Sequence, residues 1–271
     1  MANLINCPEV SVILATYNEP KNIIQQSIDS ILSQSFVNLE LLIIDDSTSI
    51  ETKTYIDSLA SDARVVIIRR FDRIGFVEAL NIGLKQAKGA FIARMDADDI
   101  ALPKRLEIQL NYLKENPAIS VVGGSIYCMD ENGLIQSERR YPTSGLRLNF
   151  YSIYKNPLAH PTVMMRRKCV DSGFLYDIKY KKSEDLEYWL RLKNNGFFYA
   201  NVQDFVLKYR TGSDLHLKRK KDNWKFNFKA RLSNFSFRSP ITCLLGITIS
   251  YIYTILPSFF IRTIYKYQSS K

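Results

Sequence analysis

The chain has 271 residues, of which 46% are hydrophobic and 24% charged, so it can form one large domain with an appendage and a substantial core. Its net charge of +10 is uneven, because the residues from Phe205 onward carry a net charge of +11 and the rest of the chain carries −1. A nearly neutral body argues against a catalytic domain that binds nucleic acid, and the chain shows no internal repeat, low-complexity tract or Gly/Ser linker.

Short apolar runs alternate with amphipathic stretches along the first half of the chain. The runs predict strands at residues 10–15, 39–44, 64–68, 90–95 and 119–123. The stretches predict helices at residues 21–33, 51–59, 76–87 and 102–114. Uninterrupted apolar strands that alternate with helices indicate an α/β fold with a mostly parallel sheet and helices on both faces.

Polar clusters follow three of these strands. Residues 16–19 follow the first strand, Asp45 and Asp46 the second, and residues 96–99 the fourth. Ligands of such sheets bind beyond the carboxyl ends of the strands. We therefore expect the functional site at this edge.

The third cluster places the carboxylates of Asp96, Asp98 and Asp99 within four residues. Crowded carboxylates repel one another unless a divalent cation neutralises them, and hard oxygen ligands suit Mg²⁺ or Mn²⁺. Such an ion normally completes its shell with substrate phosphates. The alternative is a solvated acidic turn that caps the helix beginning near Pro103.

Four segments in this order resemble glycosyltransferase family 2, and they lie at residues 11–18, 43–47, 79–83 and 96–99. The resemblance covers about residues 8–212 and extends to enzymes of bacterial O-antigen and capsule synthesis. It implies the GT-A fold and an inverting transferase with a nucleotide-sugar donor, most often UDP-linked, and a divalent metal.

The resemblance implies donor-binding roles at the ends of the first two strands. Thr16, Tyr17 and Asn18 stand where the family positions the base and ribose of the nucleotide. After the second strand, Asp45 or Asp46 is expected to accept a hydrogen bond from the uracil N–H, with a slight preference for Asp46. The alternative is that both carboxylates cap the helix that follows.

Further donor contacts are implied along the chain. Arg73 and Asn81 resemble positions near the donor, although Arg73 could be a solvated loop charge and Asn81 could stabilise a turn. Asp98 is expected to bind the metal that bridges the diphosphate, and Asp96 to reach the ribose or a metal-bound water. Asp99 either supports the site or caps the next helix.

An inverting transfer also needs a carboxylate beside the acceptor hydroxyl. Glu184 and Asp185 precede an apolar helix and resemble the Glu-Asp motif of the family. We expect Asp185 to be the base and Glu184 its orienting partner, with capping of the helix as the alternative. Trp189 is expected in the core, and His160 either contacts acceptor or diphosphate or is structural.

The sequence leaves the roles of His216 and Arg94 open. Family members often carry a histidine two residues after a Tyr-Arg pair, where this chain has Gly212. His216 is the nearest imidazole and a candidate metal ligand. Arg94, directly before the cluster, forms either a structural ion pair or a donor contact.

The remaining part of the predicted domain is expected to hold the acceptor. Asn132-Gly133 predicts a tight hairpin turn, and residues 139–141 and 149–156 are expected to line the acceptor cleft. We expect a catalytic domain at 1–215, with a nucleotide-sugar half at about 1–125 and an acceptor half at about 126–215.

Residues 216–271 are expected to form a helical, membrane-associating tail. Residues 218–229 are basic with interleaved aromatics, which suits anionic lipid headgroups and would also suit single-stranded nucleic acid. Residues 241–261 contain no charged side chain. We favour an in-plane or re-entrant membrane segment there, ahead of a true span or a helical hairpin that covers the domain.

The expected location is the cytoplasmic face of the inner (plasma) membrane, peripheral or anchored by the C-terminal segment. The four cysteines have no paired or metal-type spacing, and residues 1–30 lack the basic-then-apolar run of a signal peptide.

Taken together, these features lead us to expect transfer of a hexose or N-acetylhexosamine from a UDP-sugar, with Mn²⁺ or Mg²⁺, to a glycan acceptor carried on a polyprenyl diphosphate lipid. The expected partners include an anionic membrane surface and exclude nucleic acid. The alternative is a catalytically silent module that only binds the nucleotide-sugar.

Overall fold

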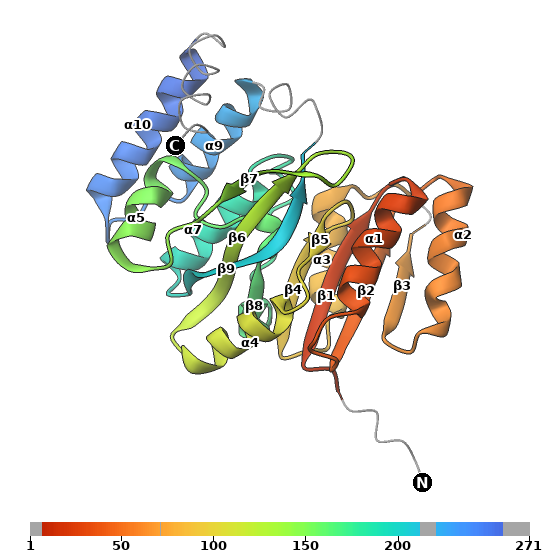
Figure 1. The fold of residues 1–271 in the computed structure, drawn as a ribbon. Helices are drawn as coiled ribbons and strands as arrows, with labels where there is room; N and C mark the ends of the chain where they lie inside the picture. The colour runs from red at the N-terminus through yellow and green to blue at the C-terminus, as the bar shows by residue number, and fades with distance from the viewer. Residues whose placement is uncertain (1–6, 71, 212–220, 257–271) are drawn as a thin grey trace.

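A computed structural model describes residues 7–70, 72–211 and 221–256 of the chain. In this part, one nine-stranded sheet has the strand order β3-β2-β1-β4-β8-β6-β9-β5, with β7 paired to β6. Figure 1 shows β3 and α2 at one end of the molecule, and α5, α9 and α10 gathered at the other. The sheet is mixed, with its first four strands parallel.

The elements expected in the first half form close to their expected ranges. The parallel strands are β1 (Val10–Thr16), β2 (Leu39–Asp45), β3 (Val65–Arg69) and β4 (Phe91–Asp96). The helices are α1 (Lys21–Leu32), α2 (Ile50–Ser58), the 3₁₀ helix η1 (Leu59–Ser61), α3 (Phe76–Gln86) and α4 (Arg105–Glu115).

Helices cover both faces of the sheet, and this explains the uninterrupted apolar runs. Val12 and Leu14 of β1 pack in one core cluster with α1 and α4, while Ile13 packs in a second cluster with α3 and α7 (Glu184–Asn194). Both sets of side chains leave water on folding. Trp189 of α7 is fully buried in the second cluster, so its expected place in the core is confirmed.

Strand β6 (Ile119–Met129) continues well beyond its expected end at residue 123. Glycine usually interrupts strand patterns, but Gly123 and Gly124 permit close packing here. A Cβ atom at Gly124 would lie 2.6 Å from the side chain of Val206 in β9 (Phe198–Arg210). The glycines therefore let β6 pair with β9 along its length.

The remaining elements complete the second half of the domain. They are β5 (Ile100–Ala101), β7 (Ile135–Arg139), α5 (Gly145–Tyr154), the 3₁₀ helix η2 (His160–Thr162), β8 (Met164–Arg166) and α6 (Lys168–Asp171). β6 and β7 pair antiparallel across a turn in which Gly133 has a φ of 85°, which confirms the expected hairpin.

After β9, the described chain resumes with α9 (Lys221–Ser233) and α10 (Pro240–Ile255). These two helices pack against each other, α10 also contacts α5, and α9 contacts α7 (Figure 1). Trp224 of α9 stacks on Tyr253 of α10, with ring centroids 4.1 Å apart. The described part of the tail, residues 221–256, thus forms a helical hairpin that packs on the domain. Within residues 7–70, 72–211 and 221–256, we find no helix that combines the length and hydrophobicity needed to cross a bilayer.

Candidate active site

Three polar strand ends meet at one edge of the sheet. β1 lies between β2 and β4, and the register aligns Thr16 with Asp45 and Ala15 with Asp96. The backbone N–H of Asp46 donates to the carbonyl of Thr16 at 3.0 Å. The expected convergence of the polar clusters is therefore confirmed.

Asn18 fixes the loop after β1. Its backbone is left-handed, with a φ of 62°, which asparagine tolerates better than most residues. Its side-chain oxygen accepts from the N–H groups of Thr48 and Ser49, each at 2.8 Å, and its amide donates to the Thr48 hydroxyl at 2.9 Å. Asn18 thus ties the end of β1 to the segment that begins α2.

Tyr17 and Arg73 lie together on the exposed side of this edge. The guanidinium carbon of Arg73 is 4.1 Å from the centroid of the Tyr17 ring. The carboxylate of Glu19 accepts from the Tyr17 N–H at 2.7 Å and also from the Thr16 hydroxyl. Since both Tyr17 and Arg73 are exposed, they present an aromatic and cationic surface beside the strand ends.

The carboxylate of Asp45 is buried and paired. One oxygen lies 2.6 Å from the guanidinium of Arg69, and the other accepts from the Ser47 N–H at 3.0 Å. The cap of α2 is Ser49, whose hydroxyl accepts from the N–H of Thr52 at 3.4 Å. The alternative in which Asp45 and Asp46 cap this helix is therefore wrong.

Asp46 organises the segment before α3. Its two carboxylate oxygens accept from the N–H groups of Ile74 and Gly75, at 3.1 and 3.0 Å. These bonds fix the backbone next to Arg73 and bring that loop to the end of β2. The sequence analysis did not predict the ion pair of Arg69 or the hydrogen bonds of Asp46 to the backbone, because no local sequence pattern indicates either.

Asn81 has a structural role in this fold. It is buried, and its amide group both donates to and accepts from the backbone of Tyr176, each at 2.9 Å. Both polar atoms are engaged in joining α3 to the segment before α7, and a donor contact of Asn81 stays a prediction. The alternative was that Asn81 stabilises a local turn. Asn81 does stabilise the backbone, but at Tyr176, which is distant in the sequence.

The three acidic side chains after β4 form one cluster. Oxygen atoms of Asp96, Asp98 and Asp99 all lie within 4.8 Å of one another. Asp99 is fully buried, and its Oδ2 has no hydrogen-bond partner among the described residues. Burial, together with the charges of Asp96 and Asp98, raises the pKa of Asp99 well above its usual value.

This geometry fits a divalent cation. Crowded carboxylates with a buried, unpartnered oxygen supply the hard oxygen ligands that Mg²⁺ or Mn²⁺ takes. The alternative of a solvated, helix-capping turn is wrong, because Asp99 is buried and α4 begins without a side-chain cap.

Arg210, at the end of β9, holds the cluster from the other side. Its backbone N–H donates to Asp99 at 2.8 Å, and its side chain donates to the carbonyls of Asp98 and Glu131, at 2.9 and 2.8 Å. These bonds give Arg210 a structural role at the end of β9. The candidate ligand His216 lies outside the described residues.

Arg94 is buried directly behind the acidic cluster. Its guanidinium forms an ion pair with Asp96, so the expected ion pair is confirmed. The guanidinium carbon also lies 5.2 Å from the centroid of the Phe76 ring. Its positive charge also lowers the pKa of Glu184 and of Asp185, against the effect of burial, so Arg94 lies near that pair as well as near the acidic cluster.

Glu184 and Asp185 occupy the amino end of α7. Asp185 accepts from the N–H of Leu186 at 2.7 Å and from the amide of Asn156. Burial raises the pKa of Asp185. Burial, followed by the charge of Asp185, raises the pKa of Glu184 to about 7. Ser183, just before them, is left-handed with a φ of 58°, a constraint often found at functional sites.

His160 lies beside this pair. Its Nδ1 is 3.8 Å from Glu184, and its Nε2 is 2.9 Å from the hydroxyl of Tyr176. Burial and the charge of Arg94 lower the pKa of His160 well below its usual value, so the imidazole is neutral near pH 7. A neutral imidazole beside the carboxyl pair is compatible with both interpretations of His160, a contact to the acceptor or diphosphate and a structural role.

The Glu184→Gln variant is expected to change how stability depends on pH. Because the folded-state pKa of Glu184 is raised from 4.5 to about 7, the wild type loses stability as pH rises through that window. Glutamine removes this loss, so the variant gains up to about 3 kcal/mol relative to wild type between pH 4.5 and 8. Urea unfolding across this range measures the gain, and a pH-independent difference contradicts the raised pKa.

A cleft of about 870 Å³ opens beside Asp185. The two stretches expected to line an acceptor cleft both contribute to its wall, through Arg139 to Tyr141 and through Tyr151 to Asn156. Another part of the wall comes from α9, through Trp224, Asn227 and Arg231. Sequence reasoning missed this wall, because the charge of the tail favoured a membrane role for it.

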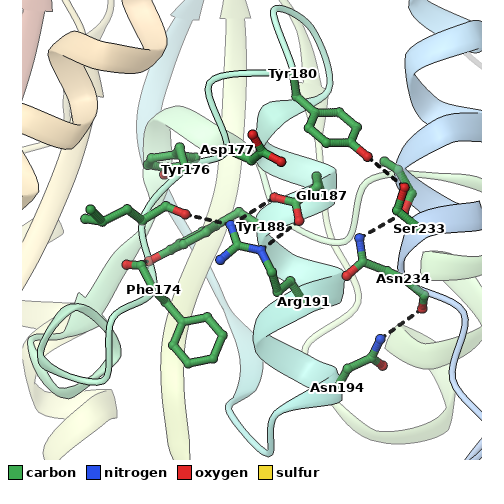
Figure 2. Close-up of polar contacts among 12 residues, drawn as sticks. Phe174, Tyr176, Asp177, Tyr180, Glu187, Tyr188, Arg191, Asn194, Ser233 and Asn234 are labelled. Atoms are coloured by element: carbon green, nitrogen blue, oxygen red, sulfur yellow. Dashed lines mark hydrogen bonds and ion pairs between the residues drawn. The ribbon is translucent and has the colours of Figure 1, made fainter.

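Figure 2 shows how α9 is held against α7. The hydroxyl of Tyr180 donates to Ser233 at 3.0 Å, and the amide of Asn194 donates to the carbonyl of Asn234 at 2.9 Å. Within α7, Arg191 pairs with Glu187 at 2.7 Å. The helix that carries Asp185 is thus connected to the wall formed by α9.

Comparison with known proteins agrees with this geometry. The model of the family described as Glycosyl transferase family 2 matches residues 11–174. The amylovoran biosynthesis glycosyltransferase AmsE of Erwinia amylovora is 32% identical over 80% of this chain and 80% of its own. WfgD of Escherichia coli, named as a UDP-Glc:alpha-D-GlcNAc-diphosphoundecaprenol beta-1,3-glucosyltransferase, is 30% identical over 74% of this chain and 76% of its own.

Solved structures show the same fold. TarS 1–349 of S. aureus, in complex with UDP-GlcNAc, has a TM-score of 0.65 at 18% identity, covering 83% of this chain and 66% of that one. The mannosyltransferase PcManGT of Pyrobaculum calidifontis, with GDP-Man and Mn²⁺, has a TM-score of 0.64 at 16% identity, covering 97% and 81%. The family match, the acidic cluster and this GT-A-like fold agree, and the chain belongs to glycosyltransferase family 2.

Proposed function

We propose that the chain is a metal-dependent inverting glycosyltransferase that moves a hexose or N-acetylhexosamine from a UDP-sugar to a glycan acceptor in bacterial surface polysaccharide biosynthesis. The observation that carries this proposal is the acidic cluster of Asp96, Asp98 and Asp99, whose Asp96 forms an ion pair with the buried Arg94. The UDP-sugar in TarS and the names of AmsE and WfgD support the donor and the pathway.

The acidic cluster is the proposed metal site. Asp98, with Asp96, would hold Mn²⁺ or Mg²⁺, and His216 is a proposed further ligand. The ion would stabilise the charge that develops on the departing nucleoside diphosphate. Asp99 and Arg210 would keep the cluster in place, since their hydrogen bond joins β9 to this site.

The nucleotide is proposed to lie along the ends of β1 and β2. Thr16, Tyr17 and Asn18 line this edge, with the Arg73 guanidinium against the Tyr17 ring. Asp45 and Asp46 would serve this site mainly through the backbone that they fix, since their oxygens already bind Arg69 and three backbone N–H groups. Asp46 remains our preferred acceptor for the uracil N–H, because a carboxylate oxygen can accept more than one bond.

Asp185 is the proposed base. The acceptor hydroxyl would attack the anomeric carbon from the face opposite the diphosphate, while the bond from that carbon to the diphosphate oxygen breaks. The hydroxyl proton would pass to Asp185, and the nucleoside diphosphate would leave with the bonding electrons. Glu184 and Asn156 orient the base, since both lie beside it.

The acceptor is proposed to be lipid-linked, as the name of WfgD states for that enzyme. We propose residues 1–215 as the catalytic domain, with donor and acceptor halves meeting near 125, and residues 216–271 as a tail that contacts the cytoplasmic face of the membrane. Large apolar side chains on α10 are exposed, among them Ile241, Leu244 and Ile255. Lys229 and Arg238 are exposed close by in the sequence, and cations favour anionic lipid.

The variant with Ile241→Glu and Leu244→Glu is expected to bind vesicles of anionic phospholipid about tenfold more weakly than wild type, because it removes two apolar anchors and adds two negative charges. Sedimentation with vesicles measures the binding. Ile50→Glu is the matched control, since Ile50 is also exposed but lies on α2 at the other end of the sheet (Figure 1). Equal binding by all three proteins contradicts membrane contact through α10.

The experiment that tests the proposed function is UDP release by the purified full chain, with Mn²⁺, Mg²⁺ or EDTA, across a set of UDP-hexoses. Metal-dependent release from one donor supports the proposal and identifies the sugar. Saturable UDP binding without release or transfer on any acceptor supports the silent binding module instead. Absence of both binding and release contradicts the donor site.

A further inference from the structure

The cleft beside Asp185 has an uneven balance of charge. Its two acidic residues are both engaged: Glu138 pairs with Arg140 at the rim, 3.4 Å apart, and Asp185 accepts from Leu186 and Asn156. Arg139 and Arg231 also line the cleft, and neither forms an ion pair with a carboxylate among the described residues. The cleft therefore has a surplus of positive charge.

Arg231 is a buried cation on the wall formed by α9. Only 8% of the residue is exposed, and one Nη donates to the carbonyl of Ser152 at 2.8 Å. Burial lowers the pKa of Arg231 to about 10, so the side chain remains charged at neutral pH. A buried charge without a counter-ion is costly, and such groups often mark a site that binds the opposite charge.

Arg139 lines another part of the cleft wall, at the end of β7. Its neighbours are the phenol groups of Tyr141 and Tyr151, which are neutral at pH 7. Lys155 also lines this wall, with its Nζ 5.4 Å from the centroid of the Tyr151 ring. Cations thus stand on both parts of the wall, which suits a ligand that carries more than one negative charge.

We propose that Arg139 and Arg231 bind the diphosphate group of the acceptor. This inference rests on the proposed function and adds to it the residues that would recognise the acceptor. A diphosphate diester carries two negative charges and several acceptor oxygens, and arginine forks bind such oxygens in pairs. A uronic acid or a single phosphodiester carries one charge and matches two arginines less well.

The subsite is separate from the proposed donor site. None of the acidic cluster residues lines the cleft, whereas Asp185 does. The diphosphate of the acceptor would therefore lie on the far side of the base from the metal. An acceptor held there by its diphosphate would present its sugar hydroxyl towards Asp185.

The test is binding of decyl diphosphate to the full chain by titration calorimetry, in EDTA so that no metal recruits the probe to the acidic cluster. Arg139→Gln and Arg231→Lys are each expected to raise the Kd about tenfold, through the loss of a charge or of the paired hydrogen bonds. Decyl phosphate has the same chain and is expected to bind more weakly than decyl diphosphate. Equal binding of the two probes overturns the diphosphate assignment.

Arg147→Gln is the matched control, because it removes the same charge from an exposed residue of α5 that does not line the cleft. Its Kd is expected to stay close to that of wild type. UDP binding with Mn²⁺ is measured on every variant, and it should not change. Unaltered decyl diphosphate binding in Arg139→Gln and Arg231→Lys overturns the subsite alone, whereas a wild type that fails to bind UDP contradicts the proposed function.

Discussion

Asp185→Asn is expected to lower the kcat of sugar transfer about a thousandfold while leaving the Kd for UDP nearly unchanged. Asparagine keeps the size of the side chain and one oxygen that can accept from the Leu186 N–H. It cannot take the proton of the acceptor hydroxyl, so the loss falls on the chemical step. Steady-state kinetics with the donor identified by UDP release, and calorimetry with UDP, separate the two effects.

Asp177→Asn is the matched control for this variant. Asp177 precedes α7 in the same segment, and its carboxylate accepts only the N–H of Lys179, at 2.9 Å, in the described structure. Its kcat should remain close to that of wild type. A wild-type kcat in Asp185→Asn would show that Asp185 is not the base. Glu184 is then the first carboxyl group to test, since its pKa is about 7.

Asp98→Asn is expected to abolish metal-dependent UDP release, with a loss of about a thousandfold or more. The substitution removes a charged oxygen from a cluster whose members lie within 4.8 Å of one another. The metal is then held more weakly, and the departing diphosphate loses its counter-charge. The Kd for UDP, measured with Mn²⁺ and with EDTA, should become nearly the same in the variant.

Asp29→Asn controls for the change in net charge, because Asp29 is an exposed residue of α1. It should preserve both turnover and the response to Mn²⁺. If Asp98→Asn retained a wild-type gain in UDP affinity from Mn²⁺, the acidic cluster would not be the metal site. The proposed roles of Asp96 and His216 would fall with it.

The fold of the first half could be predicted from sequence, because its signal is local and repeated. Strands β1, β2 and β4 are apolar runs buried on both faces, and each run ends in polar residues. Parallel strands place such ends at one edge, so the meeting of Thr16, Asp45 and Asp96 followed from the pattern alone. The hairpin at Gly133 followed from turn chemistry in the same way.

What sequence reasoning missed depends on contacts between distant residues. The amides of Asn18 and Asn81 bind backbone groups 30 and 95 residues away, and nothing in the local sequence predicts these bonds. Gly123 looked like the end of a strand, yet it allows β6 to pair with β9. No local pattern distinguishes a polar side chain that binds a ligand from one that satisfies a buried backbone group.

The tail shows how composition can mislead. Its basic and aromatic residues favoured a lipid surface, and the exposed face of α10 agrees with that expectation. The same segment also contains Trp224 and Arg231, which are buried and line the cleft beside Asp185. A helix can present one face to the domain and another to its surroundings. The net charge of the segment does not show which residues lie on which face.

The wall formed by α9 also has a consequence for how such an enzyme can diverge. The proposed donor residues lie at positions 16–99, whereas this wall comes from α9, beyond the segment matched by the family model. Mutations that accumulate in α9 would reshape the space for the acceptor while the nucleotide edge stays intact. A lineage could in this way acquire a new glycan linkage by changing α9, and keep the same activated sugar.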